Sequence, residues 1–396
     1  MKGIAILGFG NIGSGVADLI EKNKSIIEKA VSDTVEIKYL VDLRDFPDSP
    51  YADKIVHDLT PVLSDPEVSV VVETMGGSHP AYEFSLAIME AGKSVVTSNK
   101  EVVANFGTEL LAAAGKNGVS YCFEASVGGG IPIIRAFKTS LLSDGVVDIC
   151  GILNGTTNYI LTQMKENGTP FADALAEAQR LGYAEPDPSA DIDAIDTQRK
   201  TCILCALATG QLVNPENIHT KTLRNVSTDD IAGAEKADAV IKLIGRATVR
   251  EDGKVNLSAK PSMVRKSNPL ATIRDVYNGI YVKTALTGDL MFYGRGAGKF
   301  PTASAVVSDV INVLTGADQR LTPWTRAEAD YIAPADACVT ERYLRVPADV
   351  AAEANKLFAD ATKLSPTEFL CVAETEASFL AKVAPLAPEA IYDLIG

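Results

Sequence analysis

The chain has 396 residues, of which 46% are hydrophobic and 22% are charged. A chain of this length can bury a large core and is expected to fold as about two or three domains. Its 37 basic and 51 acidic residues leave a formal net charge of −14, which disfavours nucleic acid and anionic membrane as partners. No apolar stretch approaches the roughly 18 residues of a membrane-spanning helix, and no secretory signal pattern precedes the first strand. We therefore expect a cytoplasmic protein.

The cysteines and histidines form no pattern typical of a metal site, a disulfide framework or a hydrolase. Cys202 and Cys205 are closely spaced, but they lie in an apolar helical run without a second pair or a nearby histidine. Packing in a core is the better interpretation of this pair. The histidines, His57, His79 and His219, have no plausible nucleophile or second ligand beside them. This argues against a serine–histidine hydrolase and a histidine-ligated metal enzyme.

An apolar strand runs into a glycine-rich turn near the N-terminus, and helical spacing follows from Val16 to Ala30. Gly8 permits the tight turn, Gly10 lets a pyrophosphate approach the backbone, and Gly13 lets helix and strand pack closely. A purely structural turn is the alternative, but the order of strand, turn, helix and strand favours a dinucleotide site. The candidate phosphate-binding residues are Gly8, Phe9, Gly10, Asn11, Ile12 and Gly13.

Strands and helices alternate over the first third of the chain. The segments 68–73, 93–97 and 119–123 are rich in β-branched and apolar residues, and the segments 82–91 and 102–116 between them have helical spacing. Such alternation is typical of a doubly wound parallel sheet of the Rossmann type.

Ligands of such sheets collect at the carboxyl ends of the strands, so two further loops are expected beside the glycine turn. A second turn of small residues leads into a helix at 302–313 that we expect to return to the cofactor-binding domain. These loops add the following candidates for cofactor binding: Thr74, Met75, Gly76, Thr97, Ser98, Lys100, Gly296 and Gly298. Lys100 has the alternative of covering an apolar rim with its stem, but its place at the end of a strand favours contact with a ligand.

The end of the second strand bears on the choice between NAD and NADP. Asp42 lies where an acidic side chain binds the ribose hydroxyls of NAD, whereas Arg44 is placed to pair with the 2′-phosphate of NADP. The spacing of Asp42 from Gly13 also exceeds the usual ~20 residues. We therefore predict that both cofactors are used.

The pattern of residues changes near Glu124, where a glycine-rich segment marks a domain boundary. We predict a Rossmann domain over 1–128, an α+β catalytic and dimerisation domain over 129–328, and a small α/β module over 329–396. The last module is a candidate regulatory domain, cap or dimerisation element, and we expect it to be dispensable for the chemistry.

A strongly charged segment at 182–200 carries the catalytic candidates. Two prolines keep its first half non-helical, so a helix is expected to begin near Asp191 and to continue through an apolar run. Asp196 and Lys200 then lie four residues apart on one face. A surface ion pair is the alternative, but the apolar run beyond Lys200 favours a buried helix whose first turns face a cleft. Neighbouring carboxylates favour the protonated lysine, and hydride reduction requires a proton held beside a carbonyl.

Three long motifs follow the glycine turn: Glu124-Ala-Ser-Val-Gly-Gly-Gly-Ile-Pro-Ile133, Gly151-Ile-Leu-Asn-Gly-Thr-Thr-Asn-Tyr159 and Gly182-Tyr-Ala-Glu-Pro-Asp-Pro188. Together with that turn they resemble the homoserine dehydrogenase family, from Met1 to about Val313. The resemblance implies a reversible, NAD(P)H-dependent reduction of L-aspartate 4-semialdehyde to L-homoserine, in the biosynthesis of threonine, methionine and isoleucine.

The resemblance also implies roles for single residues. It places the catalytic lysine at Lys200, and a second lysine, between cofactor and substrate, at Lys100. The carboxylates that order the substrate fall on Glu185, Asp191 and Asp196. Candidates for binding the substrate carboxylate are Asn154, Thr156 and Thr157. In one departure, the glycine usual in the family two residues before Asp196 is Ala194 here, whose methyl group is expected to tilt the helix slightly.

A monovalent-cation loop, built largely of backbone carbonyls, is a further property that the resemblance implies. In this chain a sodium ion would be held by Glu124, Val127, Gly129 and Ile131. A plain hinge between two domains is an equal alternative for the same segment.

We expect a homodimer or a higher homo-oligomer that acts on a small molecule. Two alternatives remain open: another Rossmann dehydrogenase of an amino-acid precursor, and a non-catalytic cofactor-sensing protein. A sensor would not need the five charged residues Lys100, Glu185, Asp191, Asp196 and Lys200.

Overall fold

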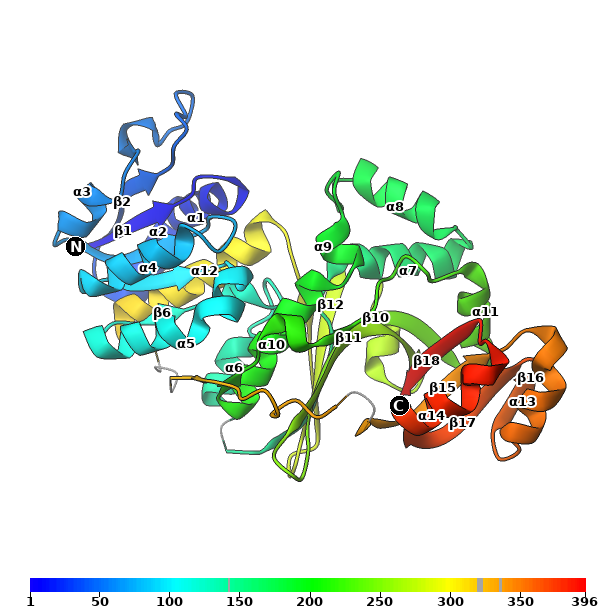
Figure 1. The fold of residues 1–396 in the computed structure, drawn as a ribbon. Coiled ribbons are helices and arrows are strands. Elements are labelled where there is room, and N and C mark those ends of the chain that lie inside the picture. The colour runs from blue at the N-terminus through cyan, green and yellow to red at the C-terminus, as the bar shows by residue number, and fades with distance from the viewer. Residues whose placement is uncertain (142, 319–322, 335–336) are drawn as a thin grey trace. The chain divides into compact units, whose positions relative to one another are not determined.

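The computed structural model describes residues 1–141, 143–318, 323–334 and 337–396. These residues form two compact units, each assembled from separate stretches of the chain (Figure 1). Unit 1 comprises Met1–Gly145, Cys202–Pro215 and Gly294–Ala327, and unit 2 comprises Val146–Thr201, Glu216–Tyr293 and Glu328–Gly396. The chain therefore returns to unit 1 twice, and the second return contains the segment 302–313, which the sequence predicts to return to the cofactor-binding domain.

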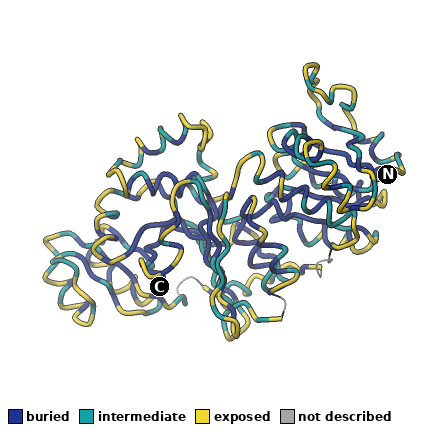
Figure 2. Tube along the Cα trace, turned by 180° about the vertical axis from the view of Figure 1, so that it is seen from behind, coloured by how far each residue is buried: buried dark blue, intermediate teal, exposed yellow. Residues whose placement is uncertain are grey.

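Unit 1 is built on six parallel strands in the order β3-β2-β1-β4-β5-β6. β1 (Lys2–Leu7) and β4 (Val68–Glu73) lie at its centre and are largely buried (Figure 2), as unbroken apolar strands of a parallel sheet are. The strand order reverses between them, at the place where ligands bind in such sheets. The other strands are β2 (Val35–Val41), β3 (Ile55–Val56), β5 (Ser94–Thr97) and β6 (Tyr121–Cys122). The predicted Rossmann-like sheet is confirmed.

The helices of unit 1 pack against this sheet. α12 (Lys299–Thr315) contacts α1 (Asn11–Lys22), and both share an apolar cluster with Ile4 and Ile6 of β1. The prediction of one helix over Val16–Ala30 is wrong, because Asn23 leaves the helical conformation between α1 and α2 (Lys24–Val31). The remaining helices are α3 (Thr60–Ser64), α4 (Ala81–Glu90), α5 (Lys100–Asn117), α6 (Ile133–Thr139) and the short η1 (Ala52–Lys54) and η2 (Glu124–Ser126). β8 (Gln211–Leu212) pairs with β14 (Thr325–Arg326).

Unit 2 has a mixed sheet in the order β13-β12-β7-β10-β11-β18-β15-β17-β16, with β9 (His219–Thr220) beside β11. The antiparallel core consists of β7 (Val146–Ile152), β10 (Ala239–Val249), β11 (Val255–Arg265) and β12 (Tyr277–Thr284). β13 (Asp289–Arg295) follows β12. The short helix η4 (Pro269–Thr272) lies between β11 and β12, and another, η3 (Pro215–Asn217), precedes β9.

Four α-helices and one α-helical turn lie between β7 and β10 in the chain. They are α7 (Gly155–Asn167), α8 (Phe171–Arg180), α9 (Ser189–Ile192), α10 (Ile195–Thr209) and α11 (Thr228–Lys236). The helix expected from Asp191 onward is interrupted, because Ala194 has a φ of +65° between α9 and α10. A Cβ at Gly245 would lie 2.3 Å from Oγ1 of Thr201, so β10 needs a glycine where α10 crosses it.

The last elements extend the sheet of unit 2 and do not form a separate body. They are β15 (Val339–Arg345), η6 (Ala348–Val350), α13 (Ala351–Leu357), β16 (Thr362–Ser365), β17 (Glu368–Thr375), α14 (Glu376–Val383), η7 (Ala384–Leu386) and β18 (Ala390–Ile395). β18 pairs in parallel with β11, and Ile395 packs in one cluster with Cys150 and Ile244. Within the described ranges, no helix is both long enough and apolar enough to cross a membrane.

Candidate active site

The glycine turn joins β1 to α1, and glycine suits each of its three positions for a different reason. Gly8 has a φ of +86°, a left-handed conformation that favours glycine. A Cβ at Gly13 would lie 2.0 Å from the carbonyl oxygen of Gly8, so a side chain there would push the helix away. A Cβ at Gly10 would meet no atom within 4 Å, which leaves open space beside the N-terminus of α1. The turn has the geometry of a dinucleotide phosphate site.

The loop after β4 is hydrogen-bonded to this turn. The hydroxyl of Thr74 lies 2.8 Å from the carbonyl oxygen of Gly8 and 3.0 Å from that of Leu7, and it donates its proton to them. Met75 and Gly76 continue the loop, and a Cβ at Gly76 would also meet open space. The structure therefore brings the predicted loop residues beside the glycine turn.

Asp42 follows β2, and its carboxylate is already hydrogen-bonded. It accepts from the backbone N–H of Phe9 at 2.8 Å, and the guanidinium of Arg44 binds both of its oxygens at 2.9 Å. These bonds from Arg44 outweigh burial and lower the pKa of Asp42 to about 2. Nδ1 of His57 lies 2.8 Å from the carbonyl oxygen of Asp42. An anionic and a cationic side chain thus lie together at the position that the sequence predicts to distinguish NAD from NADP.

Lys100 is the first residue of α5, which begins at the carboxyl end of β5. Asn99 caps this helix with its side-chain oxygen. Thr97 ends β5, Ser98 follows it, and β5 lies next to β4 in the sheet. These residues therefore lie on the same edge as Thr74.

The second small-residue turn also belongs to unit 1. Gly298 caps α12 with a φ of +114°, and Lys299 pairs with Asp18 of α1 at 2.8 Å. A Cβ at Gly129 would lie 2.5 Å from the carbonyl oxygen of Gly296, so the two glycine-rich segments touch backbone to backbone. Gly296 and Gly298 thus lie at the start of a helix that packs on α1.

Lys200 lies in unit 2, one helical turn after Asp196 in α10. It is 7% exposed, and Asp196 is 4% exposed. Nζ of Lys200 donates to Oδ2 of Asp196 and to the carbonyl oxygen of Leu153, each at 2.7 Å. This is a buried ammonium in a fixed position and not a surface ion pair.

Asn154 connects this pair to Asp191. Its side-chain nitrogen donates to Oδ1 of Asp191 at 2.7 Å and to Oδ2 of Asp196 at 2.9 Å. Its side-chain oxygen accepts from the backbone N–H of Thr157 at 2.9 Å and so caps α7. Burial and the charge of Asp196 raise the pKa of Asp191. The site therefore gathers two carboxylates and one ammonium around one amide.

Three other predicted residues have different surroundings. The hydroxyl of Thr156 donates to the carbonyl oxygen of Tyr183 at 2.7 Å, and that of Thr157 bonds to Asn154. Glu185 is exposed in the loop between α8 and α9. Among the described residues, its carboxylate makes no hydrogen bond to Asn154 and no ion pair with Lys200, so the structure does not bring Glu185 into the cluster.

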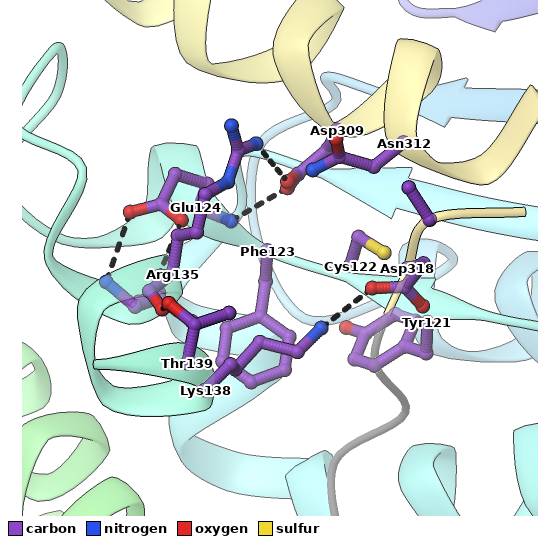
Figure 3. A pocket seen from close by; sticks show the side chains of 12 residues that line it. Tyr121, Cys122, Phe123, Glu124, Arg135, Lys138, Thr139, Asp309, Asn312 and Asp318 are labelled. Carbon is purple, nitrogen blue, oxygen red and sulfur yellow. Dashed lines mark hydrogen bonds and ion pairs between the residues drawn. The ribbon is translucent and has the colours of Figure 1, made fainter. Parts of the chain in front are cut away.

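The segment predicted to hold a cation lies in unit 1, and one of its four residues, Glu124, lines a cavity of about 80 Å³ (Figure 3). The carboxylate of Glu124 turns toward the N-terminus of α6, where it accepts from the N–H groups of Ile134 at 2.9 Å and Arg135 at 2.7 Å. Its backbone N–H donates to Asp309 of α12. Burial and the charge of Asp309 raise the pKa of Glu124 to about 7. In the described part of the chain, no group of three or more His, Cys, Asp or Glu is arranged to hold a metal ion.

Sequence reasoning assigns no role to Glu73, Asn99 and His57, which contact the segments that follow the carboxyl ends of the strands in unit 1. We call this side of the sheet the cofactor edge. Glu73 has a usable signal, because it is the only charged residue in a strand whose other residues are valines and one serine. Asn99 precedes a helix, as capping residues do. His57 has no signal in the sequence, because β3 brings it to Asp42 from a distant part of the chain.

Two family models match the chain. One, described as homoserine dehydrogenase, matches residues 132–311, and the other, described as homoserine dehydrogenase, NAD binding domain, matches residues 8–124. The homoserine dehydrogenase of Synechocystis sp. is 41% identical over 356 residues, which cover 86% of this chain and 82% of the relative. That of Neisseria gonorrhoeae is 37% identical over 361 residues, which cover 87% of this chain and 81% of the relative.

Solved structures agree with these matches. A homoserine dehydrogenase from Thiobacillus denitrificans is 32% identical and superposes with a TM-score of 0.88, covering 99% of this chain and 98% of that one. A hyperthermophilic archaeal homoserine dehydrogenase in complex with NADPH is 27% identical, with a TM-score of 0.69 over 81% of this chain and 100% of that one. The chain belongs to the homoserine dehydrogenase family of NAD(P)-dependent oxidoreductases.

Proposed function

We propose that Lys200 is the proton donor when this homoserine dehydrogenase reduces L-aspartate 4-semialdehyde to L-homoserine. The observation that carries the proposal is the burial of Nζ between Asp196 and the carbonyl oxygen of Leu153, each 2.7 Å away. An ammonium held by two acceptors has a fixed position from which it can protonate a developing alkoxide.

The acid–base step follows from these contacts. A nicotinamide cofactor, held by the glycine turn and the loops beside it, would supply the hydride that the aldehyde carbon accepts. Lys200 stabilises the charge that grows on the aldehyde oxygen and transfers a proton to it from Nζ. In the reverse direction the neutral amine of Lys200 accepts the proton of the alcohol. Asp196 directs Nζ throughout, because it accepts one of the ammonium protons.

We infer that Asp191 binds the ammonium group of the substrate. Asp191 and Asp196 share the amide of Asn154, and their mutual repulsion contributes to the raised pKa of Asp191. A cation placed beside Asp191 relieves this repulsion. Glu185, exposed on its loop, is proposed to join Asp191 when substrate binds. Thr156 and Thr157, at the N-terminus of α7, are proposed to bind the substrate carboxylate.

We propose that both NAD and NADP bind along the edge of unit 1 formed by the glycine turn, Thr74–Gly76, Thr97–Lys100 and the second small-residue turn. Asp42 accepts ribose hydroxyls, and Arg44 leaves its carboxylate partner to bind the 2′-phosphate of NADP. The side chain of Arg44 is 64% exposed, which supports such a movement.

We also propose that a sodium ion binds the carbonyl oxygens of Glu124, Val127, Gly129 and Ile131. The donor set fits a hard monovalent cation only through the backbone, because the carboxylate of Glu124 is engaged by α6. The carbonyl oxygen of Ile131 already accepts a hydrogen bond from the N–H of Ile133 at 2.8 Å. It would have to bind the ion in addition to this N–H. Measuring bound sodium in protein dialysed against a sodium-free buffer tests this site.

A cytoplasmic location and a homodimer remain proposals. All six cysteines are free, as is usual where thiols are kept reduced. Sedimentation velocity tests the oligomeric state.

The experiment that tests the function compares hydroxy amino acids. Reduction of NAD⁺ and NADP⁺ is followed with homoserine, serine and threonine as substrates. Turnover with homoserine in clear excess over the other two supports the proposal. Equal turnover with all three, or none with homoserine, contradicts it and favours a different dehydrogenase or a cofactor sensor.

A further inference from the structure

Glu73, the last residue of β4, is a fully buried carboxylate that the proposed chemistry does not use. It is 0% exposed, and it has no ion pair among the described residues. Burial raises the pKa of Glu73 to about 7. A buried carboxylate without a counter-ion is costly unless hydrogen bonds compensate it, so its donors are informative.

The donors to Glu73 come from two different loops. The backbone N–H of Met75, in the loop after β4, donates to Oε1 at 2.7 Å. The hydroxyl of Thr97, at the end of β5, donates to Oε2 at 2.5 Å. One carboxylate thus joins the ends of two neighbouring strands on the cofactor edge.

The connection continues into α5 and returns to the first loop. The hydroxyl oxygen of Thr97 accepts from the backbone N–H of Asn99 at 2.9 Å. The side-chain amide of Asn99 donates to the carbonyl oxygen of Gly77 at 2.7 Å. Glu73, Thr97, Asn99 and the loop 74–77 therefore form a closed ring of hydrogen bonds.

We propose that Glu73 is a positioning residue for the cofactor, whose ionised carboxylate holds the loops 74–77 and 97–100 in the arrangement that binds the dinucleotide. Glu73 acts through Met75 and Thr97 and does not itself touch the reacting atoms. The inference rests on the proposed binding of the cofactor along this edge.

The ionised form is the one that satisfies every donor. A protonated Glu73 would present its own O–H to Thr97, whose hydroxyl oxygen already accepts from Asn99. The hydroxyl proton of Thr97 would then lose its acceptor, and the ring would lose one bond. Among the described residues, the titratable group that interacts with Glu73 is the phenol of Tyr121 on β6, which is buried and makes no hydrogen bond to any of them. No charged group in this part of the chain is therefore shown to offset the change.

Folding stability and cofactor affinity then depend on pH in opposite directions. The folded-state pKa of Glu73, about 7, lies above the ordinary value of 4.5. Its contribution to stability is present below pH 4.5 and is lost as the pH rises toward 7, because the folded state holds the proton more tightly. Cofactor affinity should instead rise over the upper part of this range, as the carboxylate forms. A merely structural role gives the first dependence without the second.

The test is a fluorescence titration with NADH, which lacks a titrating 2′-phosphate, between about pH 6 and about pH 8, on either side of the pKa of Glu73. The wild-type dissociation constant should fall with rising pH. In Glu73→Gln it should be about 10-fold higher at the upper pH and show a much weaker dependence, as the loss of a buried hydrogen bond predicts. The turnover number at saturating cofactor should change far less than the KM for cofactor. Glu90→Gln, an exposed residue of α4, is the matched control and should behave as wild type.

Thr97→Val and Thr97→Ser provide a second pair if Glu73→Gln fails to fold. The valine variant removes the hydroxyl and should weaken NADH binding, whereas the serine variant keeps it and should restore binding. Parallel pH profiles for wild type and Glu73→Gln, with equal affinity for NADH, overturn the inference while the proposed function stands. A folded wild type that binds neither NADH nor NADPH overturns both.

Discussion

Asn154 and Asp196 are joined by a hydrogen bond of 2.9 Å, although 41 residues lie between them in the chain. The same amide nitrogen bonds Asp191 at 2.7 Å, while the amide oxygen caps α7. Asn154 therefore orients two carboxylates, whereas the sequence suggests that it binds the substrate carboxylate. The buried lysine depends on this arrangement, because Asp196 accepts from both Asn154 and Lys200.

Asn154→Ser should separate the two roles of this residue. Serine can still cap α7, so the free energy of unfolding should fall by no more than about 1–2 kcal/mol. It is too short to bridge the carboxylates, so turnover with homoserine should fall by at least about 10-fold. The pKa of Asp191, already raised by burial, should rise further without the bond from Asn154, and the acid limb of kcat/KM should move to higher pH. Unchanged kcat/KM across the pH range would contradict the bridging role.

Arg44→Ala should change the preference between the two cofactors. The variant leaves the Asp42 carboxylate without its partner, and an uncompensated carboxylate repels the 2′-phosphate of NADP. A charge-assisted hydrogen bond is worth about 1.5–3 kcal/mol, so kcat/KM with NADP should fall roughly 10- to 100-fold relative to NAD. Asp42→Asn is the opposite control and should lower kcat/KM with NAD. An unaltered ratio in Arg44→Ala would show that the arginine has no part in recognition.

Ala194→Gly should be almost neutral for stability. Ala194 is fully buried and has a φ of +65°. Glycine relieves about 1–2 kcal/mol of left-handed strain, but loses a similar amount through unfolded-chain entropy and the buried methyl group. Ala176→Gly, at an exposed helical position of α8, should instead cost about 1 kcal/mol. Denaturant unfolding of both variants checks this difference, and equal losses would speak against the left-handed conformation.

Asp393→Asn should show that the C-terminal elements belong to unit 2. Asp393 of β18 pairs with Lys260 of β11 at 2.6 Å and with Arg342 of β15 at 3.2 Å. Loss of the carboxylate leaves two buried cations unpaired, which should lower the free energy of unfolding by roughly 3–5 kcal/mol. Binding of NADH, proposed for unit 1, should persist at low temperature.

The same pair gives a pH dependence with a defined sign. Although burial opposes it, the charges of Lys260 and Arg342 lower the pKa of Asp393. The stability that Asp393 contributes is therefore present above its unfolded pKa and is lost as the pH falls through the folded pKa. Wild type should lose this contribution in acid, and Asp393→Asn should not. An Asp393→Asn variant as stable as wild type would contradict the stabilising role of this carboxylate.

Local rules predict the parts of this fold that depend on neighbouring residues. The glycine turn and β4 follow from glycine chemistry and a valine-rich run, and the pairing of Asp196 with Lys200 follows from helical spacing. β10 is not predicted, because Lys242 and Arg246 interrupt its apolar pattern. Both side chains find partners far away in the sequence: Lys242 bonds Asn158 at 2.8 Å, and Arg246 pairs with Asp148 at 3.0 Å.

Contacts between distant parts of the chain also form the site, and the sequence does not predict them. The bridge made by Asn154 and the ring around Glu73 depend on which strands become neighbours, and no spacing in the sequence contains that information. β18 also pairs with a strand from a distant part of the chain. The family resemblance predicts that Glu185 lies near the substrate, whereas in the structure this residue is exposed on its loop.

The most direct test of the account is the turnover of Lys200→Ala with homoserine, measured together with the dissociation constant of NADH on the same preparation. If Lys200 is the proton donor, turnover should fall by about 10²–10⁴-fold while NADH binds as in wild type. Lys200→Arg should lose nearly as much, because a guanidinium keeps the charge but does not release its proton. Turnover within a few-fold of wild type in Lys200→Ala, with NADH bound normally, would contradict the assignment and move the role to Lys100.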